Sequence, residues 1–245
     1  MEPAEYARVA AVEEQHWWYR STRALMADLL APWLATDQTI LDAGCGPGGT
    51  GAWLTRHGHV VAVDEAPAAL RFVRSRRPAL APVRADLQAL PFRDRTFDVA
   101  VAITVVYSVP DDTAAVTELA RVLRPGGVAL LFEPAFRALR RAHDTTVHTR
   151  RRYRRAELAG VARRAGLRVE RASYAYAFLS PPAAALAAAD RLRPRGIADA
   201  GSDVERRALD RVFAPLARLE RRRLRRADVP FGTSAFVVAT RPGSA

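Results

Sequence analysis

Short apolar runs alternate with amphipathic stretches along the first 135 residues. The apolar runs "QTILDAG", "HVVAVDEA", "PVRADLQALPF", "FDVAVAITVVYSV" and "VALLFEP" each contain a segment of strand length. Between them, stretches such as "TGAWLTRHG", "PAALRFVRSRR" and "DDTAAVTELARVL" place apolar residues at helical spacing. Strands and helices that alternate at about 20 residues per unit predict an α/β fold with a doubly wound parallel sheet.

The flanking regions add helices to this predicted core. Residues 4–35 read as two helices, and "RRAELAGVARRAG" and "LRVERASYAYAF" read as a helix and a strand. A long helical stretch, 180–228, separates them from a last strand, "TSAFVVATR". The predicted division is an N-terminal helical lid (1–36), a cofactor-binding core (37–179), a helical insertion that forms an acceptor lid (180–230), and the last strand with a tail (231–245).

A glycine-rich loop follows the first predicted strand, in "ILDAGCGPGG" (40–49). Gly44, Gly46 and Gly49 fit G-x-G-x-x-G, the dinucleotide-binding pattern. Gly44, Gly46 and Gly48 fit a second pattern, G-x-G-x-G, equally well. Glycine lets the backbone approach a ligand closely, so the loop indicates a cofactor without choosing between the two classes.

Acidic residues at successive strand ends favour S-adenosylmethionine over a nicotinamide dinucleotide. Asp42 precedes the loop, where a carboxylate would repel a pyrophosphate but suits the ammonium of a methionine moiety. Asp64 ends the second strand, 20 residues after Gly44, and can accept hydrogen bonds from ribose hydroxyls. Asp86 follows the third strand and can receive the adenine amine, with Leu87 against the ring. A NAD-dependent oxidoreductase is the alternative.

Residues 38–135 resemble the class I S-adenosylmethionine-dependent methyltransferases. The segments that carry the resemblance are "ILDAGCGPGG", "VVAVDEA", "RADLQALPF", "FDVAVAITVVYSVPD" and "RVLRPGGVALLFEP". The resemblance implies a Rossmann-like, mostly parallel seven-stranded sheet whose antiparallel last strand forms a hairpin of 168–175 with 232–240. By position, it assigns cofactor contacts to Asp42, Gly44, Cys45, Gly46, Gly48, Asp64, Glu65, Asp86, Leu87, Ala102 and Ile103.

An aromatic cluster, "HWWYR", lies in the predicted N-terminal lid. It resembles the lid segment of a subgroup of these methyltransferases, laid over the cofactor cleft. Tyr19 and Arg23 are four residues apart and share one helical face. We expect Arg23 to bind the cofactor carboxylate and Tyr19 to close over the methionine chain. Aromatic residues that only anchor a docked helix are the alternative.

Candidate acceptor residues follow the fifth strand, in "AHDTTVHTRRRYRRAEL" (142–158), which resembles runs in the same subgroup where a histidine and a tyrosine face the acceptor. For a hydroxyl acceptor, His148 is the candidate general base, oriented by Asp144. Ser108 stands where many relatives have a histidine, and Tyr107 beside it is a further catalytic candidate. The spacing of these residues, His143 included, is not typical of a metal site.

Positive charge is confined to the second half of the chain. All 38 basic residues are arginine; residues 1–136 hold 13 of them against 16 acids, and residues 137–245 hold 25 against 10 acids. This asymmetry leaves an RNA methyltransferase as an alternative. The chain shows no recognisable RNA-binding module, and we expect a small-molecule methyl acceptor instead of nucleic acid.

The arginine-rich segment near 209–226 has an amphipathic pattern. We expect a helix docked as a lid, and contact with an anionic membrane surface is the alternative. Its predicted apolar face consists of Leu209, Val212, Phe213, Leu216 and Leu219.

The cellular compartment is suggested by two features. The single cysteine, Cys45, excludes an internal disulfide and suits a reducing, cytoplasmic compartment. The acidic N-terminus argues against a signal peptide, and the uncharged run 172–189 is too weakly apolar to predict a membrane span.

Overall fold

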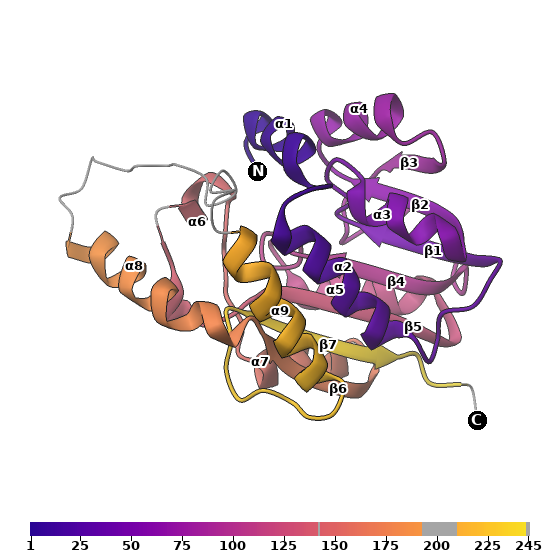
Figure 1. Cartoon of the computed structure of the whole chain (residues 1–245). Coiled ribbons are helices and arrows are strands. Elements are labelled where there is room, and N and C mark those ends of the chain that lie inside the picture. Colours follow the sequence, from indigo (N-terminus) through magenta and orange to yellow (C-terminus); the bar gives the residue numbers. More distant parts are fainter. Residues whose placement is uncertain (142, 193–209, 244–245) are drawn as a thin grey trace.

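A seven-stranded sheet forms the centre of the computed structural model, which describes residues 1–141, 143–192 and 210–243 (Figure 1). Its strand order is β3-β2-β1-β4-β5-β7-β6; β7 is antiparallel to both of its neighbours, and the other pairs are parallel. This confirms the predicted doubly wound sheet with a C-terminal hairpin. The strands are β1 Gln38–Ala43, β2 Gly58–Asp64, β3 Leu80–Arg84, β4 Phe97–Ile103, β5 Leu123–Pro134, β6 Arg168–Ala175 and β7 Ser234–Thr240.

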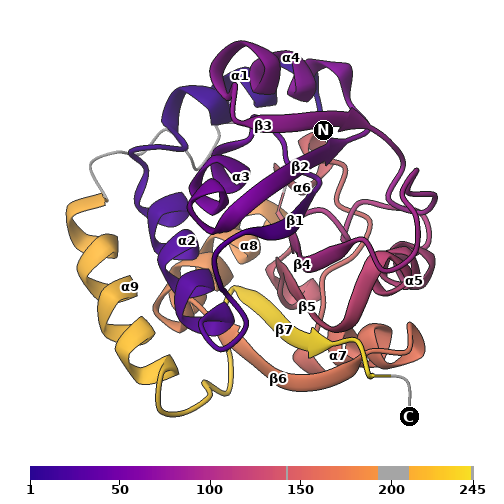
Figure 2. The same ribbon diagram turned by 90° about the vertical axis from the view of Figure 1, so that its right-hand side faces the viewer.

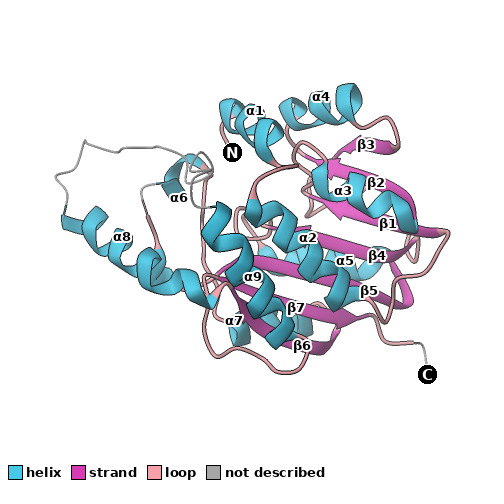
Figure 3. Cartoon of the chain, in the orientation of Figure 1, coloured by secondary structure: helices cyan, strands magenta, loops and turns pink. Residues whose placement is uncertain are grey.

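Helices cover both faces of the sheet (Figure 3). Helices α2, α3 and α9 lie on one side and α5 and α7 on the other, whereas α8 projects away from the sheet (Figures 1 and 2). The helices are α1 Pro3–Val12, α2 Trp17–Leu30, α3 Gly49–Leu54, α4 Pro67–Arg76, α5 Asp112–Val122, α6 His143–Thr146, α7 Arg155–Arg164, α8 Ser180–Leu192 and α9 Asp210–Leu224, with 3-10 turns at Thr55–His57, Arg137–Leu139 and Ala177–Leu179.

The strand order reverses between β1 and β4. From β1 the chain moves outward through β2 to β3, and it then returns to add β4 and β5 on the other side of β1. The carboxyl ends of β1 and β4 therefore flank a crevice, which is where doubly wound sheets bind their ligands.

Strand β4 is shorter than its apolar run predicts. It ends at Ile103; Thr104 N–H still donates to the Phe132 carbonyl at 2.7 Å, and the three following N–H groups turn toward the buried carboxylate of Glu133. Val106 N–H donates to Glu133 Oε1 at 2.9 Å, and Tyr107 N–H donates to Oε2 at 3.2 Å. Burial raises the pKa of Glu133 to about 8. One carboxylate of β5 thus shapes the loop after β4.

Aromatic residues occupy the centre of the core. Phe132 on β5 and Phe236 on β7 are fully buried, and their rings stack at 6.4 Å. Trp18 and Tyr176 pack edge-on against Phe132, with centroids at 6.4 and 6.1 Å. The N-terminal helix α2 and the end of β6 therefore meet at one buried ring.

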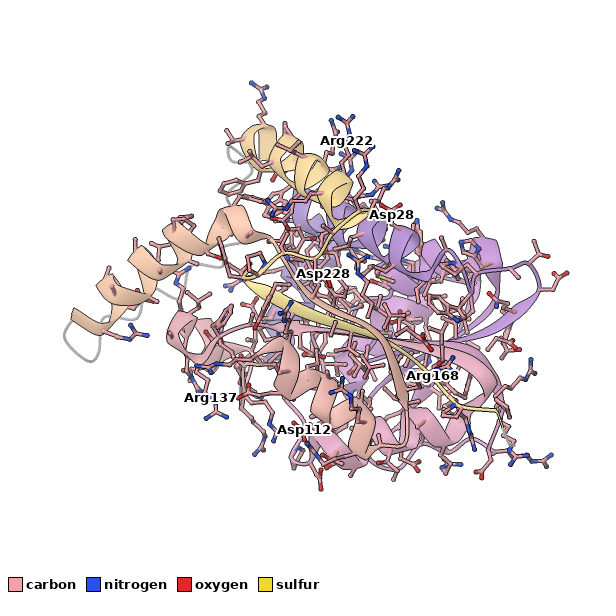
Figure 4. All side chains as sticks on the ribbon, turned by 90° about the horizontal axis from the view of Figure 1, so that it is seen from below. Asp28, Asp112, Arg137, Arg168, Arg222 and Asp228 are labelled. Atoms are coloured by element: carbon pink, nitrogen blue, oxygen red, sulfur yellow. The ribbon has the colours of Figure 1, made fainter. Side chains whose placement is uncertain are left out.

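Helix α9 of the helical insertion docks on α2 and also contacts the sheet, where Arg171 of β6 donates to the Leu224 carbonyl at 2.6 Å. Asp28 on α2 accepts hydrogen bonds from Arg221 Nε at 2.6 Å and Arg225 Nε at 2.8 Å, and it lies where α2 and α9 meet (Figure 4). These two arginines hold the pKa of Asp28 below its ordinary value, although burial acts in the opposite direction. The ion pairs join the insertion to the predicted N-terminal lid.

The predicted apolar face of α9 is only partly buried. Phe213 packs on the core, but Val212, Leu216 and Leu219 are exposed, so the prediction of one docked face is wrong. The docked side is formed by Ala217 and Leu224 with the paired arginines. Leu209 lies outside the described residues.

Replacement of the central ring tests this core. We expect Phe132→Ala to lower the free energy of unfolding by about 3–5 kcal/mol, because it leaves a cavity beneath three aromatic neighbours. Urea unfolding measures the change. The matched Phe231→Ala variant removes a half-exposed ring and should change stability by less than about 0.5 kcal/mol; equal effects would show that Phe132 does not anchor the core.

Candidate functional site

A cavity of about 940 Å³ opens at the carboxyl ends of β1, β2 and β4. The glycine loop and the acids Asp42, Asp64 and Asp86 line one end. Helices α1, α2 and α8 contribute side chains from above, including Tyr6, Tyr19 and Leu186. The topology therefore brings the predicted strand-end acids and the predicted lid to one cleft.

The glycine loop turns with backbone angles that favour glycine. Gly44, Gly46 and Gly48 have φ angles of +72°, +53° and +91°. A Cβ on Gly44 would lie 2.3 Å from Val105 Cγ2, whereas a Cβ on Gly46 would meet nothing within 4 Å. Gly44 thus allows the loop to pack on the turn after β4, and Gly46 leaves open space in the cavity.

Two predicted cofactor contacts face away from the cavity. A Cβ on Gly48 would touch Leu80 and Val73, so this residue faces the core behind the loop. Ala102 is fully buried within β4, whereas the next residue, Ile103, lines the cavity. Successive strand side chains point to opposite faces of a sheet, so Ala102 and Ile103 point in opposite directions.

Asp42 presents an unpaired carboxylate oxygen. Its side chain is buried, and Oδ2 has no hydrogen-bond partner among the described residues. Burial raises the pKa of Asp42 to about 7; a hydrogen bond from the Gly51 N–H counteracts burial in part, and the nearby Asp64 and Glu13 carboxylates raise the pKa further. The site therefore favours a cation at this oxygen.

Asp64 is held by the backbone of the glycine loop. Its Oδ2 accepts from Gly46 N–H at 3.0 Å, and its Oδ1 accepts from Ala66 N–H at 2.9 Å. Burial still raises its pKa above the ordinary value. Tyr6, on α1, lies close enough to Asp64 that this carboxylate adds to burial in raising the pKa of the Tyr6 hydroxyl. Asp64 is thus oriented by the glycine loop and lies near α1.

The remaining predicted contacts of this half lie at the edge of the cavity. Asp86 is exposed and accepts from Gln88 N–H at 2.8 Å, and Leu87 beside it is buried. Glu65 is exposed and Cys45 is buried, and both line the cavity. Burial raises the pKa of the Cys45 thiol, which fits a packed residue and not a nucleophile.

Arg23 presents a second unpaired buried group. Its Nη2 donates to the Glu13 carbonyl at 2.7 Å, but Nη1 has no acceptor among the residues that the structure describes. Burial lowers the pKa of Arg23, and Glu14 and Glu13 counteract that effect. Tyr19, one turn earlier on α2, lines the same cavity, and its burial raises its pKa.

Glu13 joins the lid to the glycine loop, a role that we did not predict. Its carboxylate accepts from Gly49 N–H at 3.1 Å and from Arg77 Nη2 at 2.8 Å, and the side chain is buried. Burial raises its pKa, and the Arg77 guanidinium counteracts this. In the sequence, Glu13 is marked only by its position between two predicted helices. That position does not indicate which residue its carboxylate binds.

The predicted pair of His148 and Asp144 does not form. His148 is exposed, and its Nε2 contacts Glu2 Oε1 at 3.0 Å, away from the cavity lining. Asp144 lines the cavity but accepts two hydrogen bonds from Arg152, both at 2.9 Å. Burial raises the pKa of Asp144, but Arg152 outweighs burial and holds it below its ordinary value. The cation is the stronger partner for this carboxylate.

Tyr107 and His16 also line the cavity. Tyr107 lines the cavity and donates to the Val147 carbonyl at 3.3 Å; burial raises its pKa, so it stays protonated at neutral pH. The side chain of His143 lies outside the described residues. His16, from the aromatic cluster, is buried in the cavity wall, and its Nδ1 accepts from Trp18 N–H at 3.3 Å.

Comparison with known proteins shows where the similarity lies. Residues 41–131 match the family described as "Methyltransferase domain". Malonyl-[acyl-carrier protein] O-methyltransferase of Salmonella typhimurium is 38% identical over 128 residues, which are 51% of this chain and 50% of that protein. A phthiotriol/phenolphthiotriol dimycocerosates methyltransferase of Mycobacterium ulcerans, named as probable, is 37% identical over 93 residues, 36% of each.

Solved structures extend the similarity in fold to the whole chain. A chain of the Haloferax volcanii complex between the Trm112 methyltransferase activator and a methyltransferase superposes with a TM-score of 0.65 at 21% identity, covering 99% of this chain and 96% of that one. In sequence, however, the chain spans about half the length of the Salmonella relative. The sequence match includes the glycine loop and all three strand-end acids.

The Glu13 contact predicts how the lid is held. We expect Glu13→Ala to loosen α1 by about 1–3 kcal/mol, because it leaves Gly49 N–H and half-buried Arg77 without this acceptor. Faster amide hydrogen exchange over residues 3–12 measures the change. Glu14→Ala removes an exposed partner of the same arginine and should have little effect. Unchanged exchange in the Glu13 variant would contradict this role.

Proposed function

We propose that this chain, whose core belongs to the class I S-adenosylmethionine-dependent methyltransferases, transfers a methyl group to an oxygen of a small molecule with an apolar body. The domain match and the fold support the cofactor. The observation that carries the proposal is the presence, in one cavity, of two buried unpaired groups of opposite charge: Asp42 Oδ2 and Arg23 Nη1.

These two groups fit the amino-acid end of S-adenosylmethionine. A buried polar atom without a partner is unfavourable, and a zwitterion supplies an ammonium for Asp42 Oδ2 and a carboxylate for Arg23 Nη1. Gly46 leaves space beside them because no Cβ occupies it. The residues present therefore fit the cofactor, and they would hold it by its charged end.

Asp64 and Asp86 fit the nucleoside end. Each oxygen of a carboxylate has more than one acceptor position, so Asp64 can still accept ribose hydroxyls while it holds its two backbone N–H groups. Leu87 supplies an apolar surface near Asp86 for the adenine ring. Tyr6, on α1, closes this end from above.

Apolar side chains from residues 139–147, 179–186 and α9 form what we call the apolar end of the cavity, namely Leu139, Val147, Leu179, Leu186 and Phe213. Arg141, Asp144, Thr149 and Arg152, from the same stretch as Leu139 and Val147, line the cavity as well. When bound, the cofactor supplies an electrophilic methyl group; the chain then has to hold the acceptor oxygen in line and exclude water. An apolar lining suits an acceptor with an apolar body, and the name of the Salmonella relative, an O-methyltransferase, supports an oxygen as the methyl acceptor.

Cofactor affinity should depend on pH through Asp42. Because burial raises the pKa of Asp42 to about 7, the carboxylate loses its charge as the pH falls through 7, and the ammonium loses its partner. We expect S-adenosylhomocysteine to bind about tenfold more weakly at pH 6 than at pH 8, measured by calorimetry. Asp42→Asn should bind weakly at both pH values. The same pH dependence in that variant would contradict the assignment.

A charge in the apolar end should block the acceptor but not the cofactor. We expect Leu186→Glu to reduce transfer of labelled methyl groups to long-chain carboxylic acids and alkylphenols at least tenfold, because a carboxylate would line their binding surface. Affinity for S-adenosylhomocysteine should stay within about twofold. Ala188→Glu, on the exposed side of α8, is the matched control. If neither substrate class is methylated but sugars or nucleotides are, the proposed acceptor class is wrong.

A further inference from the structure

The outer side of α9 has a row of exposed apolar residues. Val212, Leu216 and Leu219 are four and three residues apart, so they share one helical face. Their exposed fractions are 54%, 38% and 63%, although α9 is firmly docked through its opposite side. These three residues are among only four large hydrophobic residues exposed to this extent in the described chain.

Arginines lie beside this row. Arg211, Arg218 and Arg222 are seven and four residues apart and form a neighbouring face of the same helix. All three are exposed, and Figure 4 shows Arg222 directed away from the body of the molecule. Asp28 neutralises Arg221 and Arg225 on the docked side, whereas no carboxylate of the described residues forms a salt bridge with this outer row.

A groove confirms that leucines and arginines share one surface. It has a volume of about 900 Å³, and Leu216, Leu219, Arg222, Arg223 and Arg226 contribute to its lining. The surface therefore offers apolar side chains and positive charge to the same occupant. A helix with this composition is typical of segments that lie in the interface of a membrane, with apolar residues inserted and cations near the headgroups.

We propose that the outer side of α9 docks on the surface of an anionic phospholipid bilayer. The exposed leucines enter the boundary of the acyl region, and the outer arginines contact the phosphate groups of acidic lipids. The described residues contain no helix that is long and apolar enough to cross a membrane, so this contact is peripheral.

The proposed surface lies next to the apolar end of the cavity. Phe213, which lines the cavity, follows Val212 directly in α9. Helix α9 therefore contributes both to the proposed docking surface and to the cavity lining. The docking itself does not depend on the identity of the acceptor or on methyl transfer.

Vesicle flotation tests the proposal with the full chain. We expect binding to vesicles of phosphatidylcholine with about 30% phosphatidylglycerol and little binding to phosphatidylcholine alone. The variant Leu216→Glu/Leu219→Glu should lose at least about tenfold of the partitioning, because it removes the inserted residues. Arg222→Glu should weaken partitioning about fivefold at low salt and less at high salt.

Arg168→Glu is the control for net charge. It makes the same change of charge on β6, where Arg168 is exposed and lies elsewhere on the surface (Figure 4). It should leave vesicle binding unchanged, and thermal unfolding should show that all variants fold. Equal loss in both arginine variants, unaltered binding of the double leucine variant, or binding to single-stranded RNA without binding to vesicles would each overturn the proposal.

Discussion

The unpaired carboxylate oxygen of Asp42 and the unpaired guanidinium nitrogen of Arg23 are the constraint on which the cleft depends. Each is buried beside the same cavity, and neither is satisfied by another described residue. Burial without a partner is unfavourable, and the raised pKa of Asp42 is one expression of it. Such an arrangement is maintained by the stability of the surrounding fold, and it favours a ligand that carries both opposite charges.

The lid and the core are joined by the same kind of interaction. Glu13 bridges the start of α3 and Arg77 on the core, and its own carbonyl accepts from Arg23. Asp28, further along α2, binds two arginines of α9. The N-terminal helices are thus connected to the cofactor loop at one end and to the insertion at the other. A ligand that changes the Glu13 contacts would therefore also affect α2, which carries Asp28 and its ion pairs with α9.

The positive charge of the second half of the chain has more than one structural role. Arg152 neutralises Asp144 in the cavity wall, and Arg221 and Arg225 fasten α9 to α2. The outer arginines of α9, in contrast, face solvent next to exposed apolar side chains of the same helix. Composition alone suggested nucleic acid as one possible partner, but the arrangement of these residues on α9 matches an interfacial helix more closely.

The strand-end acids and the glycine loop could be predicted from the sequence because they depend on local order. Parallel strands have their carboxyl ends at one edge of the sheet, so residues that end β1 and β2 must approach each other wherever the helices pack. The alternation of strands and helices likewise determined the sheet, and the hairpin followed from the family resemblance. Asp42, Asp64 and Gly46 therefore lie together as their spacing predicted.

Only the tertiary structure decided the partners of side chains that lie far apart in the sequence. Asp144 binds Arg152 instead of His148, α9 buries Ala217 and leaves Leu219 in solvent, and Glu13 reaches the glycine loop. In each case the spacing of polar and apolar residues along the sequence was compatible with more than one partner. The choice depended on the directions in which docked elements point their side chains and on the burial that makes a charge require a partner, and neither is encoded in the spacing of residues along the chain.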